Sequence, residues 1–316
     1  MPRSDGDVDG AAHDAASARP RRLARWRGAG WGARRRDVLT VPARLLSDAD
    51  RAEAERLLDL EPVAAAQVAE RVEAGGLTWW RAGARVFGYG APGRLESLCW
   101  LGANLIPVRA GPDAVAGFAE LAQREGRRCS SIVGPADAVL DLWGQLQSTW
   151  APAREVRASQ PLMMTDRPST VAPDPEVRLV RSSEVGVLFP AAVAMYTEEV
   201  GVSPIVEAGG RVYRQRVAEL VRARRAYARF EDGAVVFKAE LAVVTRHTAQ
   251  VQGVWVAPEW RGRGLGVAGM AAVVADALAR VAPSVSLYVN DYNLAARRVY
   301  ERCGFRTVGT FATVLF

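Results

Sequence analysis

A proline-rich stretch near the middle of the chain divides the sequence into two parts. Four prolines fall within the 17 residues from Gln160 to Glu176. Because proline fixes φ and lacks a backbone N–H, this density suits neither a helix nor a central strand. The chain has 316 residues, about twice the length of a typical ~150-residue domain. We therefore expect two domains, at residues 37–159 and 177–316, joined by a linker over residues 160–176.

The two parts show the same order of predicted elements. Apolar periodicity and helix start and stop signals predict, in each part, a short strand, two helices, several strands, and then alternating helices and strands. In the second part, Asp232-Gly233 separates two strand-like runs, 225–231 and 234–245, and predicts a tight hairpin. The repeated order indicates a duplicated α/β fold.

The positive charge of the chain is concentrated at its N-terminus. Residues 1–36 hold nine arginines and four aspartates, so the rest of the chain carries only +1 of the total net charge of +6. This tail lacks apolar periodicity, and we expect it to be disordered. A nearly neutral body argues against recognition of a specific nucleic-acid sequence. The tail is either a dispensable extension or an electrostatic contact for RNA or anionic lipid.

Composition disfavours metal, disulfide and membrane chemistry. The three cysteines, at positions 99, 129 and 303, are far apart and odd in number. This predicts neither a zinc site nor a disulfide framework, and it indicates a reducing, cytoplasmic environment. Two histidines are too few for a histidine-rich metal site. No apolar run approaches the ~18 residues of a membrane span. We expect no bound metal and no membrane span.

The most informative segment runs from Val254 to Gly266, where a predicted strand enters a glycine-rich turn and a helix opens at once. Glycines let the backbone approach an anion, and unpaired N–H groups at a helix start can hold a pyrophosphate. The spacing is Arg261-x-x-Gly264-x-Gly266, which differs from the dinucleotide motif G-x-G-x-x-G, and Arg263 adds a cation. A simple turn between strand and helix is the alternative interpretation.

A second motif follows at a suitable interval: Asn293-x-x-Ala296-x-x-x-Tyr300-x-x-x-Gly304-Phe305. Together the two motifs resemble the GNAT superfamily of acyl-CoA-dependent N-acetyltransferases, over roughly residues 176–316. The resemblance implies two tandem GNAT-like domains, each with a mixed central sheet flanked by helices. It also implies acetyl-CoA as the co-substrate.

The resemblance assigns roles to individual residues. The glycine-rich loop would bind the CoA pyrophosphate, and the preceding strand would pair through its backbone with the pantetheine arm. This cofactor-binding set is Val254, Trp255, Val256, Arg261, Gly262, Arg263, Gly264, Leu265 and Gly266. Asn293 would contact the cofactor, and Tyr300 would protonate the departing thiolate. A helix cap for Asn293 and a packed aromatic for Tyr300 are the structural alternatives.

The first part looks like a degenerate copy of the same fold. Its equivalent junction, Val108 to Asp113, has one glycine, a proline without an amide donor and an aspartate that would repel phosphate. We expect no acyl-CoA there, and a role in walling the substrate cleft or stabilising the active domain. The whole chain, including segments 100–108 and 129–135, also looks like an actinobacterial group in which a poorly characterised N-terminal domain precedes the GNAT domain.

The general base is less clearly marked. Some family members place a glutamate base on the strand before the loop, and the equivalent position here is Gln250. Period-2 alternation puts Glu240 and Lys238, the only lysine of the chain, on one face of the neighbouring strand. Glu240 is therefore the first candidate base and His247 the second. A Lys–Glu pair whose members satisfy each other is the alternative.

Acceptor binding is assigned to Glu198 and Glu199, with Lys238 beside them. The two glutamates end a predicted helix, where the helix dipole disfavours carboxylates, so a cationic amine would be a natural partner. An ordinary solvated helix end is the alternative.

These features predict direct acetyl transfer from acetyl-CoA to a primary amine of a small molecule or peptide, in a ternary complex. One alternative is a tandem acetyltransferase resembling mycothiol synthase, which would act on a cysteinyl-sugar amine. Another is a non-catalytic acyl-CoA sensor that binds a partner. A third is an RNA-associated protein acetyltransferase that would use the arginine-rich tail.

Overall fold

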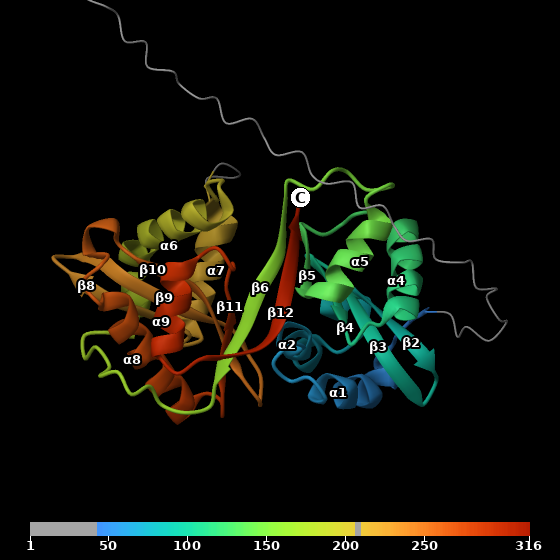
Figure 1. The fold of residues 1–316 in the computed structure, drawn as a ribbon, viewed down its shortest axis with the longest axis horizontal. Helices are drawn as coiled ribbons and strands as arrows, with labels where there is room; N and C mark the ends of the chain where they lie inside the picture. Colours follow the sequence, from blue (N-terminus) through green and yellow to red (C-terminus); the bar gives the residue numbers. More distant parts are fainter. Residues whose placement is uncertain (1–42, 206–209) are drawn as a thin grey trace, which may run out of the picture. The chain divides into compact units, whose positions relative to one another are not determined.

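The computed structural model describes residues 43–205 and 210–316 (Figure 1). The basic tail expected to be disordered, residues 1–36, lies outside the described residues. We define residues 43–165 as the N-terminal half and residues 166–316 as the C-terminal half. Within the described ranges, no helix is both long and apolar enough to cross a membrane.

Both halves contribute strands to one 12-stranded mixed sheet. In spatial order the strands are β1 (Arg44–Leu45), β2 (Arg85–Ala91), β3 (Arg94–Leu101), β4 (Asn104–Val108), β5 (Ser131–Pro135), β12 (Arg306–Leu315), β6 (Glu155–Thr165), β11 (Val285–Tyr288), β10 (Ala249–Val256), β9 (Ala234–Val244), β8 (Ala226–Glu231) and β7 (Arg178–Leu179). The predicted hairpin joins β8 to β9, and Asp232 and Gly233 both adopt the positive φ, 48° and 77°, that such a turn requires.

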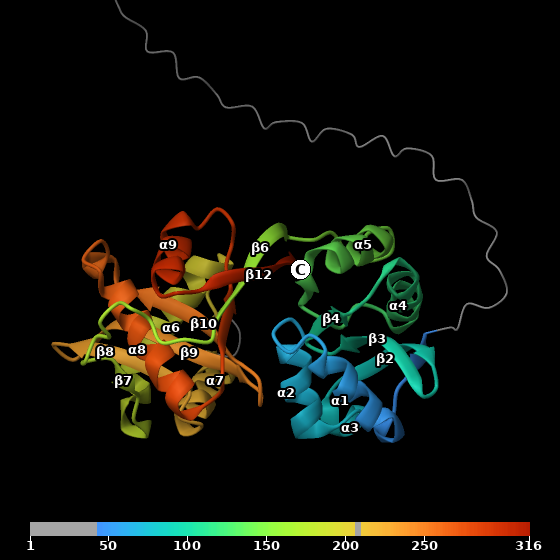
Figure 2. The same ribbon diagram turned by 60° about the horizontal axis from the view of Figure 1, so that its bottom comes forward.

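Helices cover both faces of the sheet in each half. They are α1 (Arg51–Asp59), α2 (Ala66–Gly75), α3 (Trp79–Ala82), α4 (Pro112–Glu125), α5 (Ala136–Leu146), α6 (Val185–Val200), α7 (Arg211–Arg222), α8 (Leu265–Arg280) and α9 (Leu294–Arg302). Figure 2 shows α1–α3 on one face of the N-terminal half and α4 and α5 on the other. Alternation along β3 sorts its side chains between these layers, so Leu98 packs with α1 and α2 while Cys99 packs with α4 and α5.

The two halves exchange their last strands at the centre of the sheet. β6 ends the N-terminal half but pairs with β11 of the C-terminal half, and β12 ends the chain but pairs with β5 of the N-terminal half. β6 and β12 also pair with each other, and Figure 1 shows them side by side. Neither half therefore has a complete sheet of its own, and the described residues of both halves form one compact unit.

The expected linker over residues 160–176 begins too early. Residues 160–165 are the second part of β6 and pair with both β11 and β12. Pro161 fits because the β6–β11 ladder ends one residue later, at Leu162, so a missing N–H at Pro161 costs no bond to β11. Its carbonyl still accepts the Val289 N–H at 3.2 Å. The connection between the halves is thus confined to residues 166–177.

Close packing of α8 against the sheet fixes the direction in which that helix starts. Gly269 lies over the Phe237 ring of β9, and a Cβ added at Gly269 would stand 2.7 Å from the ring. Only a glycine allows this approach. The N-terminus of α8 is therefore held beside the end of β10, where the glycine-rich segment lies.

The strand exchange predicts that residues 166–316 alone do not form a stable monomer. Without β6, the adjacent edges of β11 and β12 lose their partners, and the apolar face beneath them is exposed. We expect aggregation or exchange-labile amides in place of a cooperative thermal transition, measured by size-exclusion chromatography and circular dichroism. Co-expression with residues 1–165 should restore the transition. A monomeric 166–316 fragment that unfolds cooperatively would contradict the exchange.

Candidate active site

A cavity of about 1300 Å³ lies between the two halves. The N-terminal half lines it from α2, β4, β5 and β6, and the C-terminal half lines it from α6, α7, β9–β11, α8 and α9. The sequence-predicted residues that line it are Glu198, Glu199, Glu240, Val254, Trp255, Val256, Arg261, Gly262, Gly264, Leu265, Gly266, Asn293 and Tyr300. Most of the predicted site is thus brought to one place, and the N-terminal half forms part of its wall.

One edge of β10 is open along this cavity. The parallel strands β10 and β11 pair only at Ala249–Val285 and Gln250–Ser286 and then diverge. On its other side β10 has a bulge opposite β9, because Gln252 faces Glu240 while Trp255 faces Lys238. The backbone from Val251 to Val256 therefore has unpaired groups on the β11 side. An extended polar chain could pair with such an edge.

The glycine-rich loop opens into a helix N-terminus at the end of this edge. Gly262 and Gly264 have φ of 76° and 82°, a conformation that disfavours any side chain. A Cβ at either position would meet nothing within 4 Å, so the space above the loop is open. Gly264 is the N-cap of α8, and the first N–H groups of that helix point out of it. The loop has the shape and dipole of an anion site.

The two loop arginines have different surroundings. Arg261 lines the cavity, donates to the Val256 carbonyl at 3.0 Å, and pairs with Glu198 at 2.7 Å. Glu198 also accepts from the Trp255 indole N–H at 3.0 Å. Arg263 does not line the cavity, and its guanidinium instead stacks over the Trp260 ring. An anion in the loop would compete with Glu198 for Arg261.

The two residues of the second motif lie on α9. Asn293 is the N-cap of that helix, and its Oδ1 accepts the Ala296 N–H at 3.1 Å. It also lines the cavity, so the capping alternative is observed and does not exclude cofactor contact. Tyr300 is 7% exposed, and burial, with a smaller contribution from Glu199, raises its pKa. Its phenol therefore stays protonated and can act as a proton donor.

The predicted Lys238–Glu240 pair is present. Lys238 is only 1% exposed, and its Nζ donates to Glu240 Oε2 at 3.1 Å and to the Gly253 carbonyl at 2.9 Å. Lys238 thereby fixes the bulge of β10 and does not line the cavity, so its predicted substrate contact is replaced by a structural one. Gln250 is buried, and its Oε1 accepts from Gln67 and Gln252.

Glu199 differs from the other acids of the cavity. Four acidic residues line it, and three of them are ion-paired: Glu70 with Arg225, Glu198 with Arg261 and Glu240 with Lys238. Among the described residues, Glu199 has no such partner. Its side chain is open to water within the cavity, yet the protein atoms around it raise the carboxyl pKa by desolvation, against the attraction of Arg157. This environment suits a proton acceptor, because the raised pKa makes the Glu199 carboxylate a stronger base than an ordinary glutamate.

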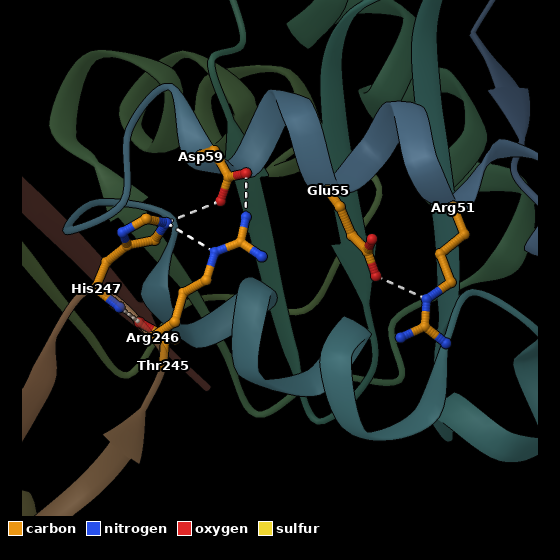
Figure 3. Close-up of polar contacts among 6 residues, drawn as sticks. All are labelled: Arg51, Glu55, Asp59, Thr245, Arg246 and His247. Atoms are coloured by element: carbon orange, nitrogen blue, oxygen red, sulfur yellow. Dashed lines mark hydrogen bonds and ion pairs between the residues drawn. The ribbon is translucent and has the colours of Figure 1, made fainter. Parts of the chain in front are cut away.

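His247 does not line the cavity, so the prediction that it is a catalytic base is wrong. It sits in the turn between β9 and β10, at the opposite end of β10 from the loop. There its Nε2 is 3.0 Å from Asp59 Oδ1 of α1, and Arg246 pairs with the same carboxylate (Figure 3). Sequence position next to a strand could not show which end of that strand faces the site.

The N-terminal residues in the cavity wall could not be predicted from the sequence. Arg71 of α2, Asn104 of β4 and Ser131 of β5 line it, together with Tyr288 at the end of β11. None belongs to a recognisable motif, and their convergence depends on the strand exchange. No group of three or more metal-ligating side chains occurs within residues 43–205 and 210–316.

Two family models match the chain. The model described as the acetyltransferase (GNAT) family matches residues 192–305, which hold the open edge, the loop and Tyr300. Residues 192–305 are a GNAT acetyltransferase domain. A domain of unknown function, DUF4081, matches residues 84–188. The chain is thus an acyltransferase in which a poorly characterised domain precedes the GNAT domain, which confirms the resemblance. A search of curated proteins found no match.

Solved structures show the same fold over most of the chain. A Drosophila protein aligns with a TM-score of 0.62 at 14% identity, covering 87% of this chain and 98% of its own. A GCN5-related N-acetyltransferase from Sphaerobacter thermophilus aligns at 0.55 and 17% identity, covering 86% and 94%. A tandem GNAT protein from the clavulanic acid biosynthesis pathway aligns at 0.51 and 15% identity, covering 86% and 97%. The fold of both halves together is therefore GNAT-like.

The loop geometry predicts that Gly264→Val abolishes binding of CoA by the GNAT domain. The branched side chain would fill the open space above the helix start. Gly233→Val is a matched control, because Gly233 also has positive φ, 77°, with nothing within 4 Å of its Cβ position, but it lies in the β8–β9 hairpin. Calorimetric titration of CoA should show loss of binding for Gly264→Val alone. Equal affinity of both variants would contradict this placement of the anion.

Proposed function

We propose that this protein transfers an acetyl group from acetyl-CoA to a primary amine of a small molecule or peptide, in a ternary complex. The observation that carries the proposal is that one cavity joins the open edge of β10, the glycine-rich loop, Tyr300 and Glu199. A thioester donor, an anion site for its carrier and two proton-transfer groups are what amine acetylation requires.

The open edge and the loop fit the two ends of the donor. We assign the CoA pyrophosphate to the N–H groups of residues 262–266, with Arg261 released from Glu198 to meet it. The pantetheine arm would pair with the backbone of Val254–Val256, on the side that β11 leaves open. Asn293 would contact the arm from the start of α9. When bound, the thioester supplies an activated acetyl carbon beside the bulge.

The bulge of β10 provides backbone donors for the carbonyl oxygen of the thioester. Gly253 and Val254 have no Cα partner on β9 or β11, and the Lys238 Nζ donates a hydrogen bond to the Gly253 carbonyl. We propose that the N–H groups of these two residues stabilise the negative charge that develops on the oxygen during attack. Fixed donors need no rearrangement at that moment, which is why they lower the barrier.

We assign the base to Glu199 in place of Glu240. The Glu240 carboxylate is already engaged by the buried Lys238, whose Nζ donates a hydrogen bond to it. The Glu199 carboxylate has no ion pair among the described residues and opens into the cavity. Glu199 would take the proton released by the acceptor nitrogen, directly or through one water. Glu240 then serves to hold Lys238 and the bulge.

Tyr300 is assigned as the acid. As the amine nitrogen bonds to the acetyl carbon, the C–S bond breaks, and Tyr300 donates its proton to the sulfur. Burial keeps this phenol protonated until the thiolate forms, and solvent later restores its proton. Cys303, one helical turn further along, is no acyl carrier, because it is buried, its Sγ faces the Val267 carbonyl, and burial raises its thiol pKa to about 11.

Two further features of the protein belong to the proposal. Cys99, Cys129 and Cys303 are free and buried, which supports a cytoplasmic location. The N-terminal half would hold no acyl-CoA, because Pro112 begins α4 where a pyrophosphate would need an amide.

A non-catalytic acyl-CoA sensor is the second candidate function, and it would need neither a protonated Tyr300 nor a free Glu199.

Tyr300→Phe should separate an enzyme from a sensor. The variant removes only the proton donor, so kcat should fall about 10²–10⁴-fold while CoA affinity is retained. Thiol release with a panel of amines gives kcat, and calorimetry gives the affinity. Phe305, which packs against the Tyr300 ring, offers a control: Phe305→Tyr adds a phenol to the same cluster without removing the donor. Full turnover by Tyr300→Phe would rule out its role as the acid.

Glu199→Gln should lower kcat/KM about 10²–10⁴-fold at neutral pH. Because its carboxyl pKa is raised, wild-type activity should fall as pH drops through that pKa, at a higher pH than for an ordinary glutamate. The deficit of the variant should shrink as pH rises, since an amine that is already neutral needs no base. A pH profile of thiol release measures both effects. If the fall in activity at low pH disappears in Glu240→Gln and remains in Glu199→Gln, Glu240 is the base.

A further inference from the structure

Arg71 brings a positive charge to the cavity from the N-terminal half, and it has no ion pair among the described residues. It lies on α2, where its Nη2 donates to Asn104 Oδ1 at 3.1 Å and its guanidinium stacks over the Trp100 ring. Its Nη1 is buried and has no hydrogen-bond partner among the described residues. An unsatisfied donor on a buried cation is costly, so a ligand that accepts from it would be stabilised.

The acid nearest in sequence, Glu70, attracts Arg71 but makes no ion pair with it. The carboxylate of Glu70 pairs with Arg225 at 2.5 Å and accepts the Val244 N–H at 3.0 Å. Burial lowers the pKa of Arg71, and the nearby positive charge of Arg216 lowers it further, although Glu70 opposes the shift. Among the described residues, Arg71 therefore has no carboxylate in direct contact with its guanidinium.

Arg216 adds a second cation from the C-terminal half. It lies on α7 and lines the same cavity. Among the described residues its guanidinium makes one hydrogen bond, from Nη2 to the Ala242 carbonyl at 3.3 Å, and no ion pair. Ser131, also in the lining, receives the Asn104 amide on its Oγ at 2.9 Å and keeps its hydroxyl proton to donate. Two guanidinium groups and a hydroxyl thus line the same cavity, and the Arg216 charge is near enough to act on Arg71, which suits a ligand carboxylate.

Glu199 and Tyr288 line the same cavity as Arg71, so a carboxylate and a guanidinium share one space. The Tyr288 phenol is close enough to both charges that Glu199 raises its pKa while Arg71 lowers it, with burial the larger cause. An acceptor that reaches from Glu199 past Tyr288 to Arg71 would meet a carboxylate at one end and a guanidinium at the other.

We propose that the acceptor is a zwitterion, whose amine faces Glu199 and whose carboxylate is bound by Arg71 and Arg216. The inference rests on the proposed acetyl transfer and specifies its substrate class: an amino acid, an ω-amino acid or a short peptide with a free carboxylate. The N-terminal half then has a definite role, because its Arg71 recognises the acidic end of the substrate. An amine without an acidic group, such as a cysteinyl sugar, would leave Arg71 unsatisfied.

The test compares acids with their own amides. The probes are α-amino acids, ω-amino acids of two to six carbons and two dipeptides, each as the free carboxylate and as the terminal amide. Each is titrated calorimetrically into the full chain saturated with CoA, so that binding is measured without turnover. We expect at least one carboxylate to bind about tenfold or more tightly than its amide, as hydrogen bonds to a charged group contribute.

Three variants locate the effect. Arg71→Gln and Arg216→Gln should each reduce the acid-to-amide ratio towards one without changing CoA affinity. Arg214→Gln is the matched control, because Arg214 lies on the same helix as Arg216 but stacks over Phe189 and does not line the cavity. Should Arg71→Gln fail to fold, the wild-type ratio and the Arg216→Gln variant still decide the question.

The outcomes distinguish this inference from the proposed function. If acids and amides bind equally, or if no acid in the panel binds, the carboxylate site is wrong, whatever amine is acetylated. If acids bind preferentially through Arg71 but no bound amine is ever acetylated, the site is right and the acetyl transfer is wrong. Preferential binding together with thiol release supports both.

Discussion

The exchange of β6 and β12 at the centre of the sheet is the interaction on which the rest of the structure depends. Because each half completes its sheet with the other's last strand, the halves cannot move apart without breaking three ladders, β5–β12, β12–β6 and β6–β11. The parallel strands β10 and β11 diverge beside this junction, so the open edge faces the N-terminal half directly. A duplicated fold of this kind yields one cavity with walls from two domains, and only one of them needs catalytic groups.

Within that cavity, function follows from which charges are paired. Lys238 and Glu240 neutralise each other beneath the bulge, and Glu198 holds Arg261 at the loop. These ion pairs stabilise the donor site, and each carboxylate in them is already neutralised by a cation. Glu199 and Arg71 lack such partners among the described residues. Burial raises the carboxyl pKa of Glu199 and lowers the guanidinium pKa of Arg71, so it favours the neutral form of each group. A ligand of opposite charge would stabilise the ionised form of each of these two groups. We therefore place proton transfer at Glu199 and substrate recognition at Arg71.

Local features were predictable from the sequence, and features that depend on distant pairing were not. The Asp232-Gly233 hairpin, the α8 start at the glycine-rich loop and the Lys238–Glu240 pair follow from turn chemistry and period-2 alternation. The strand exchange did not follow, because proline content describes a segment and not its partners. His247 was misplaced for the same reason, since a strand's sequence does not say which end reaches the site. Arg71 carries no motif, and only the fold brings it to the cavity.

We propose that the C-terminal half of this molecule binds the acyl donor and that the N-terminal half completes the acceptor site with Arg71. Calorimetric titration of acetyl-CoA into the full chain, analysed for stoichiometry, tests this division. We expect one site per chain, because the loop before α8 offers helix amides where Pro112 removes one before α4. Two sites would show that the N-terminal half is a second donor domain. No binding would contradict the assignment of the cavity as an acetyltransferase active site.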